Sequence, residues 1–263
     1  MKTTTSDSAR PSAGELSLFL SQYSARLLGA GATCIRLEKN AARIAKAYGK
    51  EAEISIMPRH VHLSVWAPGS TDTAASIAAI GHTAISFRIN TKLSELSWEI
   101  ADGKVDFATA AKRFDRIVRD DRRDPRTVLF LVALANASFC RLFGGDFIAM
   151  TTVCLATAAG YHLKLLLLGR GVDIRLTVLV CAFASAVLGA TDTLFSIGET
   201  PSVASGTSVL YLVPGIPFLN SFSDLLYRHY LCAFSRFVDA LVLTCSLSIG
   251  LCAGMLLMNI RMF

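Results

Sequence analysis

The second half of the chain is an almost unbroken run of Leu, Ala, Val, Phe and Ile, whereas the first half mixes apolar residues with charged ones. The chain has 263 residues, of which 52% are hydrophobic, and its mean hydropathy is +0.48. An apolar segment of about 20 residues is long enough to cross the hydrocarbon core of a bilayer. This composition predicts a membrane protein in which a water-soluble N-terminal part precedes a transmembrane part.

We predict that residues 123–263 form an α-helical bundle of about five transmembrane spans. The predicted spans cover about residues 127–143, 147–168, 176–195, 207–226 and 237–260. Arginine is present in the second and fourth connections between these spans, and also before the first span, whereas the first and third connections contain neither Lys nor Arg. Basic connections are retained in the cytoplasm, so we expect the N-terminus inside and the C-terminus outside.

Residues 15–122 are predicted to form a cytoplasmic α+β domain, after a polar tail at residues 1–14 that lacks the apolar core of a signal sequence. Apolar residues in this region recur at helical spacing or alternate as they do in strands. The expected helices cover residues 15–28, 33–48, 92–101 and 106–119. The expected strands cover residues 53–57, 61–66 and 83–89. This succession predicts helices packed on a short sheet.

Several classes of protein chemistry have no support in the sequence. There is no Walker A motif, no G-x-G-x-x-G and no G-x-S-x-G, so we expect neither an enzyme nor a bound cofactor, and any transport would be secondary or channel-like. The net charge of +6 does not indicate nucleic-acid binding, because Lys and Arg are interspersed with acidic residues and gather beside the apolar spans.

The cysteines and histidines do not predict a metal site. None of the seven cysteines forms a C-x-x-C pair, which argues against both a zinc site and a disulfide framework. His60 and His62 lie on the same face of a predicted strand, but a zinc site needs at least three protein ligands and no third one is near in sequence. Two solvent-facing histidines are therefore the favoured interpretation.

The segment of residues 211–226, YLVPGIPFLNSFSDLL, is apolar enough for a membrane and yet contains helix breakers and polar side chains. In hydrocarbon, the backbone groups that a broken helix leaves free need partners within the protein or in a watery cavity. We therefore predict that Pro214, Gly215, Asn220 and Asp224 belong to a substrate pathway.

Two polar residues in other spans are assigned to the same pathway. Asn136 lies deep in the first span, and Asp192 lies toward the outer end of the third, where an ionisable side chain is costly unless it faces protein or water. A structural interpretation stays open for Asp192, because Arg141 also lies near a span end and the two side chains could snorkel or pair with each other.

Charged residues also bracket the inner connection between the last two spans. Asp224 and Asp239 stand on either side of it, with Arg228 and Arg236 near them. These groups could form structural ion pairs or a relay for protons or substrate, and the sequence leaves both alternatives open.

The chain resembles the threonine/serine exporter family over residues 16–258. The resemblance begins with GAGATCIRLEKNAARIAKAYG at residues 29–49 and EISIMPRHVHLSV at residues 53–65, and it continues in FRINTKLSEL at residues 87–96. In the membrane part it rests on the Leu-Phe-Gly-Gly turn at residues 142–145 and on Val-Pro-Gly at residues 213–215. The other matching positions there are Asn220, Asp224, Arg236 and Asp239.

This resemblance implies an efflux subunit in the bacterial inner membrane that exports a small polar metabolite. Full-length exporters of the family carry a second membrane domain that is absent here, so the chain is similar to the split branch, which works with a separate small membrane subunit. That branch is associated with export of dicarboxylates such as succinate, while threonine and serine are the substrates of the wider family. A homo-oligomer is also compatible with this interpretation. The alternative is a membrane-anchored sensor or scaffold with a cytoplasmic ligand-binding domain.

Overall fold

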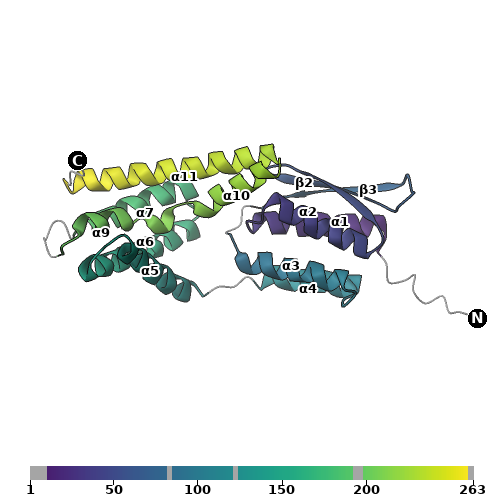
Figure 1. The fold of residues 1–263 in the computed structure, drawn as a ribbon, viewed down its shortest axis with the longest axis horizontal. Helices are drawn as coiled ribbons and strands as arrows, with labels where there is room; N and C mark the ends of the chain where they lie inside the picture. The colour runs from purple at the N-terminus through teal and green to yellow at the C-terminus, as the bar shows by residue number, and fades with distance from the viewer. Residues whose placement is uncertain (1–10, 82–84, 121–123, 192–197, 260–263) are drawn as a thin grey trace, which may run out of the picture. The chain divides into compact units, whose positions relative to one another are not determined.

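The computed structural model describes residues 11–81, 85–120, 124–191 and 198–259 (Figure 1). The chain divides into two compact units. Unit 1 combines Met1–Arg122 with Ile216–Phe237, and unit 2 combines Arg123–Gly215 with Val238–Phe263. The second half of the predicted fourth span and the connection that follows it are therefore grouped with the N-terminal part of the chain.

Unit 1 contains four helices from the N-terminal half and a three-stranded antiparallel sheet in the order β1-β2-β3. The helices are α1 (Ala13–Gly29), α2 (Cys34–Ala47), α3 (Phe87–Ala101) and α4 (Phe107–Arg119). The strands are β1 (Glu51–Ile56), β2 (His60–Trp66) and β3 (Thr73–Ala79). Side chains alternate along β2, where Val61 and Leu63 are buried while His60 and His62 are exposed, as the sequence pattern predicts.

The predicted third strand at residues 83–89 is wrong in its described part, because residues 87–89 belong to helix α3 (Phe87–Ala101). Residues 83 and 84 lie outside the described residues. The third strand is β3, ten residues earlier, and it pairs along its whole length with β2. The segment TAASIAA has little β-branched character, so its extended conformation comes from pairing and from packing on α1 rather than from propensity. Helix α3 also begins earlier than residue 92, because the Ser86 hydroxyl accepts a hydrogen bond from the amide of Ile89 at 3.3 Å and caps the helix.

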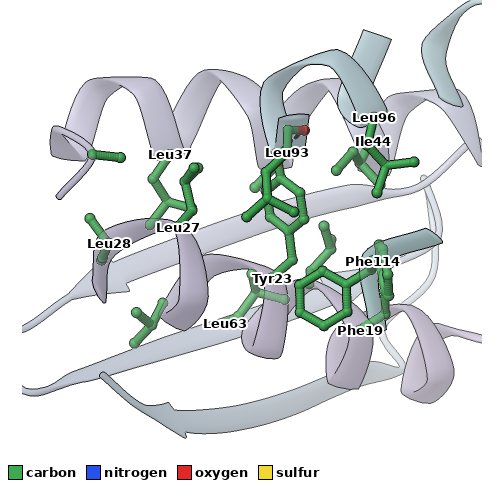
Figure 2. Close-up of a cluster of buried hydrophobic side chains, with 14 of the residues drawn as sticks. Phe19, Tyr23, Leu27, Leu28, Leu37, Ile44, Leu63, Leu93, Leu96 and Phe114 are labelled. Atoms are coloured by element: carbon green, nitrogen blue, oxygen red, sulfur yellow. Dashed lines mark hydrogen bonds between the residues drawn. The ribbon is translucent and has the colours of Figure 1, made fainter. Parts of the chain in front are cut away.

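The core of unit 1 joins all four of these helices to the inner face of the sheet. Figure 2 shows Tyr23 of α1 among leucines from neighbouring elements, with Phe19 and Phe114 beside it. The Tyr23 hydroxyl donates to the carbonyl oxygen of Leu93 at 2.8 Å and accepts from the Asn40 amide at 3.1 Å. Burial raises the pKa of Tyr23 well above its ordinary value, so the phenol stays neutral inside this core.

Unit 2 is built from apolar helices that pack side by side (Figure 1). It contains α5 (Pro125–Leu142), α6 (Phe147–Gly169), α7 (Ile174–Gly189), α9 (Pro201–Thr207) and the 3₁₀ turn η1 (Leu210–Leu212). The last helix, α11 (Tyr230–Leu257), begins in unit 1 and contributes most of its length to unit 2. Gly250 and Gly254 let α11 approach the backbone of α7 closely, which is how small residues act in membrane bundles.

Within the described ranges, α6 and α11 are each long and apolar enough to cross a membrane. A third apolar segment combines Pro201–Leu212 with Gly215–Leu226, the second part being helix α10, and the two parts are bent by 59°. Helix α7 is apolar but shorter. The predicted break in the fourth span is thus confirmed, while the total of five spans stays a prediction.

Candidate functional site

The break before α10 is produced by residues 213–215. Val213 has an extended backbone with φ −61° and ψ 125°, and Pro214 has no amide hydrogen to donate to the preceding turn. The amide of Gly215 donates to the carbonyl oxygen of Val213 at 2.9 Å, instead of to a carbonyl one helical turn earlier. The regular helical ladder is therefore interrupted between η1 and α10, as the positions of Pro214 and Gly215 predict.

Asn136 of α5 lies beside this break in unit 2. Only 3% of its surface is exposed, and its amide donates to the Thr157 hydroxyl of α6 at 2.6 Å and to the carbonyl oxygen of Thr207 at 3.2 Å. One side chain thus joins three segments of the bundle. Asn136 also lines a hollow of about 440 Å³, whose other lining residues are Val132, Ala135, Phe139, Phe143, Leu210, Tyr211 and Val213.

Tyr211 is the second polar residue of this hollow. Its hydroxyl lies 3.0 Å from the Ser185 hydroxyl of α7, and both hydroxyls lie against Gly160 of α6. A Cβ atom at Gly160 would overlap both oxygens, so the absence of a side chain there lets the tyrosine reach α7. The hollow therefore combines an apolar wall with an amide and a phenol at the point where the helix is broken.

Replacing Gly160 by alanine is expected to destabilise the protein by about 1–3 kcal/mol, the usual cost of overpacking a tight contact. The new methyl group would displace the Tyr211 hydroxyl, so Tyr211→Phe should recover part of the loss in the double variant. Thermal unfolding of the purified protein in detergent measures both effects. Gly206→Ala is the control, because no atom lies within 4 Å of the added Cβ; equal melting temperatures for the two alanine variants would contradict the expectation.

Asp224 of α10 lies in unit 1 and is completely buried. Its Oδ1 accepts a hydrogen bond from the amide of Cys34 at 2.8 Å, and its Oδ2 lies 3.0 Å from Nη1 of Arg236. Thr33 occupies the N-cap position of α2 without making a side-chain cap, and the carboxylate of Asp224 satisfies an amide of the first turn in its place. A negative charge at this helix end is also favoured by the helix dipole.

Two further side chains bind the same turn between α1 and α2. Nη2 of Arg236 donates to the carbonyl oxygen of Ala32 at 2.9 Å, and the amide of Asn220 donates to the carbonyl oxygen of Gly31 at 2.8 Å. Gly31 has a φ of +88°, a backbone conformation that favours glycine and that shapes this turn. Asn220, Asp224 and Arg236 therefore attach α10 and the start of α11 to the N-terminal helices of unit 1.

Asp239 does not belong to this cluster. It is exposed, and its Oδ1 lies 4.0 Å from Nη2 of Arg175 in unit 2. Asp224 thus forms a buried ion pair with Arg236, whereas Asp239 makes a weaker, solvent-exposed contact. A relay through these groups stays a prediction.

The turn between α10 and α11 contributes contacts that the sequence did not suggest. Arg228 has a φ of +65°, and the amide of His229 donates to the backbone carbonyl of Asp224 at 2.8 Å. The thiols of Cys34 and Cys232 interact, and Cys232 also donates to the carbonyl oxygen of Ile56 at 3.6 Å. The hydrogen bond with Cys232, followed by burial, raises the pKa of Cys34.

In unit 2, Arg141 near the end of α5 is exposed and donates to the carbonyl oxygen of Gly145 at 3.1 Å. Its predicted partner Asp192 lies outside the described residues. The carboxylate of Asp146 accepts from the amides of Ala149 at 2.7 Å and Glu199 at 2.6 Å, and these bonds hold its pKa below the usual range. Asp146 directly before an apolar run is a readable N-cap signal that we did not use.

Among the residues that the structure describes, no group of three His, Cys, Asp or Glu side chains is arranged to hold a metal ion. His60 and His62 are both exposed on β2.

Two long apolar helices and a third apolar segment with a sharp break define this molecule as an α-helical membrane protein. The chain belongs to the threonine/serine exporter family, because the family model described as "Putative threonine/serine exporter" matches residues 19–258. The resemblance inferred from the sequence motifs is thereby confirmed.

Two curated relatives are similar along nearly their whole length. One, from Klebsiella aerogenes, is called "Probable succinate transporter subunit YjjP"; it is 27% identical over 238 residues, which cover 89% of this chain and 91% of the relative. The protein with the same description from Escherichia coli K12 is 26% identical over 238 residues, with the same coverage. No solved structure matches this chain significantly.

Proposed function

We propose that this chain is one subunit of a secondary exporter in the bacterial inner membrane, with a small dicarboxylate such as succinate as its substrate. Membership of an exporter family and the names of the two relatives support a transport role. The same names, which include the word subunit, support a partner, and we propose a second small membrane subunit that completes the pathway. Threonine and serine are the other substrates that the family membership suggests.

The broken apolar segment beside a hollow with polar side chains is the observation that carries this proposal. Interrupted helices whose ends face a site near the middle of the membrane are how many secondary transporters bind small ions and acids. Here the break at Pro214 and Gly215 lies next to Tyr211, and the hollow that Tyr211 lines also contains the buried amide of Asn136. A sensor or scaffold would be anchored equally well by unbroken helices.

We further propose a topology of five spans with a cytoplasmic N-terminus. The basic residues at the ends of the apolar helices support this orientation, since the connection between α6 and α7 contains Arg170 and the turn between α10 and α11 contains Arg228. In this topology α6 runs from the outer to the inner surface, and α10 ends at the cytoplasmic side.

Efflux measurements on loaded cells test the proposal. We expect cells that make both this chain and the small membrane subunit to release succinate faster than cells that make either one alone or neither. Threonine and serine are measured in the same samples, so that the substrate class is decided together with the activity. Release at background level for all three compounds, with both subunits present in the membrane, would contradict export and favour the scaffold.

A further inference from the structure

Lys164 is the one Asp, Glu, Lys or Arg residue in the sequence of α6, and it is followed by four leucines before the helix ends at Gly169. Five residues of helix correspond to about 7.5 Å, so the Cα atom of Lys164 lies about that far from the helix end. A charged side chain at such a position in a span is costly unless it reaches the interface or faces protein or water.

The side chain of Lys164 does not extend toward the nearer helix end. Its Nζ lies 5.9 Å from the ring centroid of Tyr161, which is one turn closer to the start of α6. Lysines that snorkel direct the ammonium group toward the interface, whereas this one turns back along the helix and away from it. The side chain is half-buried, and it lies within electrostatic reach of Cys181 on α7. The ammonium group is therefore held inside the helix packing.

Within the described part of unit 2, no carboxylate forms an ion pair with Lys164. The carboxylates of Asp124, Asp146 and Asp173 cap the helices α5, α6 and α7 by accepting hydrogen bonds from amides in the first turn of each helix. Asp239 contacts Arg175. A positive charge enclosed by a bundle without a counterion is costly, and an anion that reaches it lowers this cost.

A continuous set of aromatic and hydroxyl groups leads from Lys164 to the hollow. The rings of Tyr161 and Tyr211 meet edge to face with centroids 6.3 Å apart, and the Tyr211 hydroxyl contacts that of Ser185. Tyr211 itself lines the hollow next to the helix break. Hydroxyl groups can donate hydrogen bonds to carboxylate oxygens, so this set is suited to an acid that carries more than one carboxylate.

We propose that Lys164 is the residue that binds a carboxylate group of the exported substrate, with the hydroxyls of Tyr211 and Ser185 as further donors. This inference rests on the proposed export function and names the group that selects an anionic substrate. The ammonium is attracted to the carboxylate during passage and is left without a partner when the substrate has gone.

Efflux from vesicles that contain this chain and the small membrane subunit, loaded with graded concentrations of labelled succinate, tests the inference. We expect Lys164→Gln to raise the half-saturating concentration about tenfold or more, as for the loss of one charge-assisted hydrogen bond. Lys164→Arg keeps the charge and should retain most of the affinity. Arg170→Gln removes an exposed positive charge just beyond the end of the same helix and should leave the half-saturation unchanged.

An unchanged half-saturation in Lys164→Gln, with the wild type active, would overturn this inference and leave the export function intact. A wild type without efflux would instead refute the proposed function. If Lys164→Gln does not accumulate, labelling of the wild-type subunits with an amine-acylating reagent decides the question. We expect succinate at about ten times its half-saturating concentration to reduce the labelling of Lys164 and not that of the exposed Lys112. Equal labelling of Lys164 with and without succinate would overturn the inference.

Discussion

Replacing Asp224 by alanine is expected to destabilise the protein by about 3–5 kcal/mol, the range found when one partner of a buried ion pair is removed. The carboxylate is fully buried, while the side chain of Arg236 is 22% exposed, so the variant would leave a mostly enclosed guanidinium without its counterion. The amide of Cys34 would also lose its acceptor at the start of α2, which adds about 1 kcal/mol for a lost cap. Thermal unfolding of the purified chain in detergent measures the change.

The matched control for this variant is Asp239→Asn. Asp239 also faces an arginine, but at 4.0 Å and in an exposed position, so its loss should change the stability by less than about 1 kcal/mol. Similar melting temperatures for Asp224→Ala and the wild type would show that the buried pair does not stabilise unit 1, and would contradict the structural role.

The double variant Asp224→Leu with Arg236→Met separates the structural role from a relay. Removing both charges leaves no unpaired ion, so most of the stability should return even though the contacts to Ala32 and Cys34 are lost. If export returns together with stability, the pair is structural. If stability returns and export does not, one of the two charges takes part in transport itself.

Local sequence signals predicted the helices of unit 1 well, because a helix is set by residues close together in the chain, whereas the wrongly predicted third strand depends on distant ones. Asp106 precedes α4 and its side chain caps the helix, so start and cap are both set by neighbouring residues. The Ala-rich strand β3 carries no such local signal, because its extended form depends on the ladder with β2. Pairing of this kind is decided by residues that are distant in sequence.

The contacts of the candidate sites show the same limit. Asp224 could be recognised as an unusual charge in an apolar segment, but its partner, the amide of Cys34, is 190 residues away in the chain. The burial of Asn136 was predictable from its depth in an apolar run, whereas its bond to Thr157 depends on how α5 packs on α6. The sequence shows Lys164 as a lone cation in an apolar helix. The direction of its side chain, toward Tyr161, is needed to tell that it does not snorkel to the nearer helix end.

Replacing Pro214 or Gly215 by leucine is expected to abolish export while the chain stays in the membrane. Leucine at position 214 supplies an amide hydrogen and removes the restriction on the preceding residue, so the helix can continue through the break. Leucine at position 215 adds a bulky side chain at the start of α10. Succinate efflux, normalised to the amount of each variant in the membrane fraction, measures the effect.

Two substitutions of smaller size serve as controls for the break. Gly215→Ala adds a Cβ that meets no atom within 4 Å, so it should retain export if bulk, and not glycine itself, is what the position excludes. Pro217→Ala changes the second proline of the segment, which lies in the first turn of α10, where the helix does not use the amide hydrogen. We expect near wild-type efflux from both, and full efflux from the two leucine variants would refute a role for the break. Asp224→Ala should lower both stability and export. If Pro214→Leu instead loses export and keeps its stability, the break acts in transport and is not needed to hold unit 1 together.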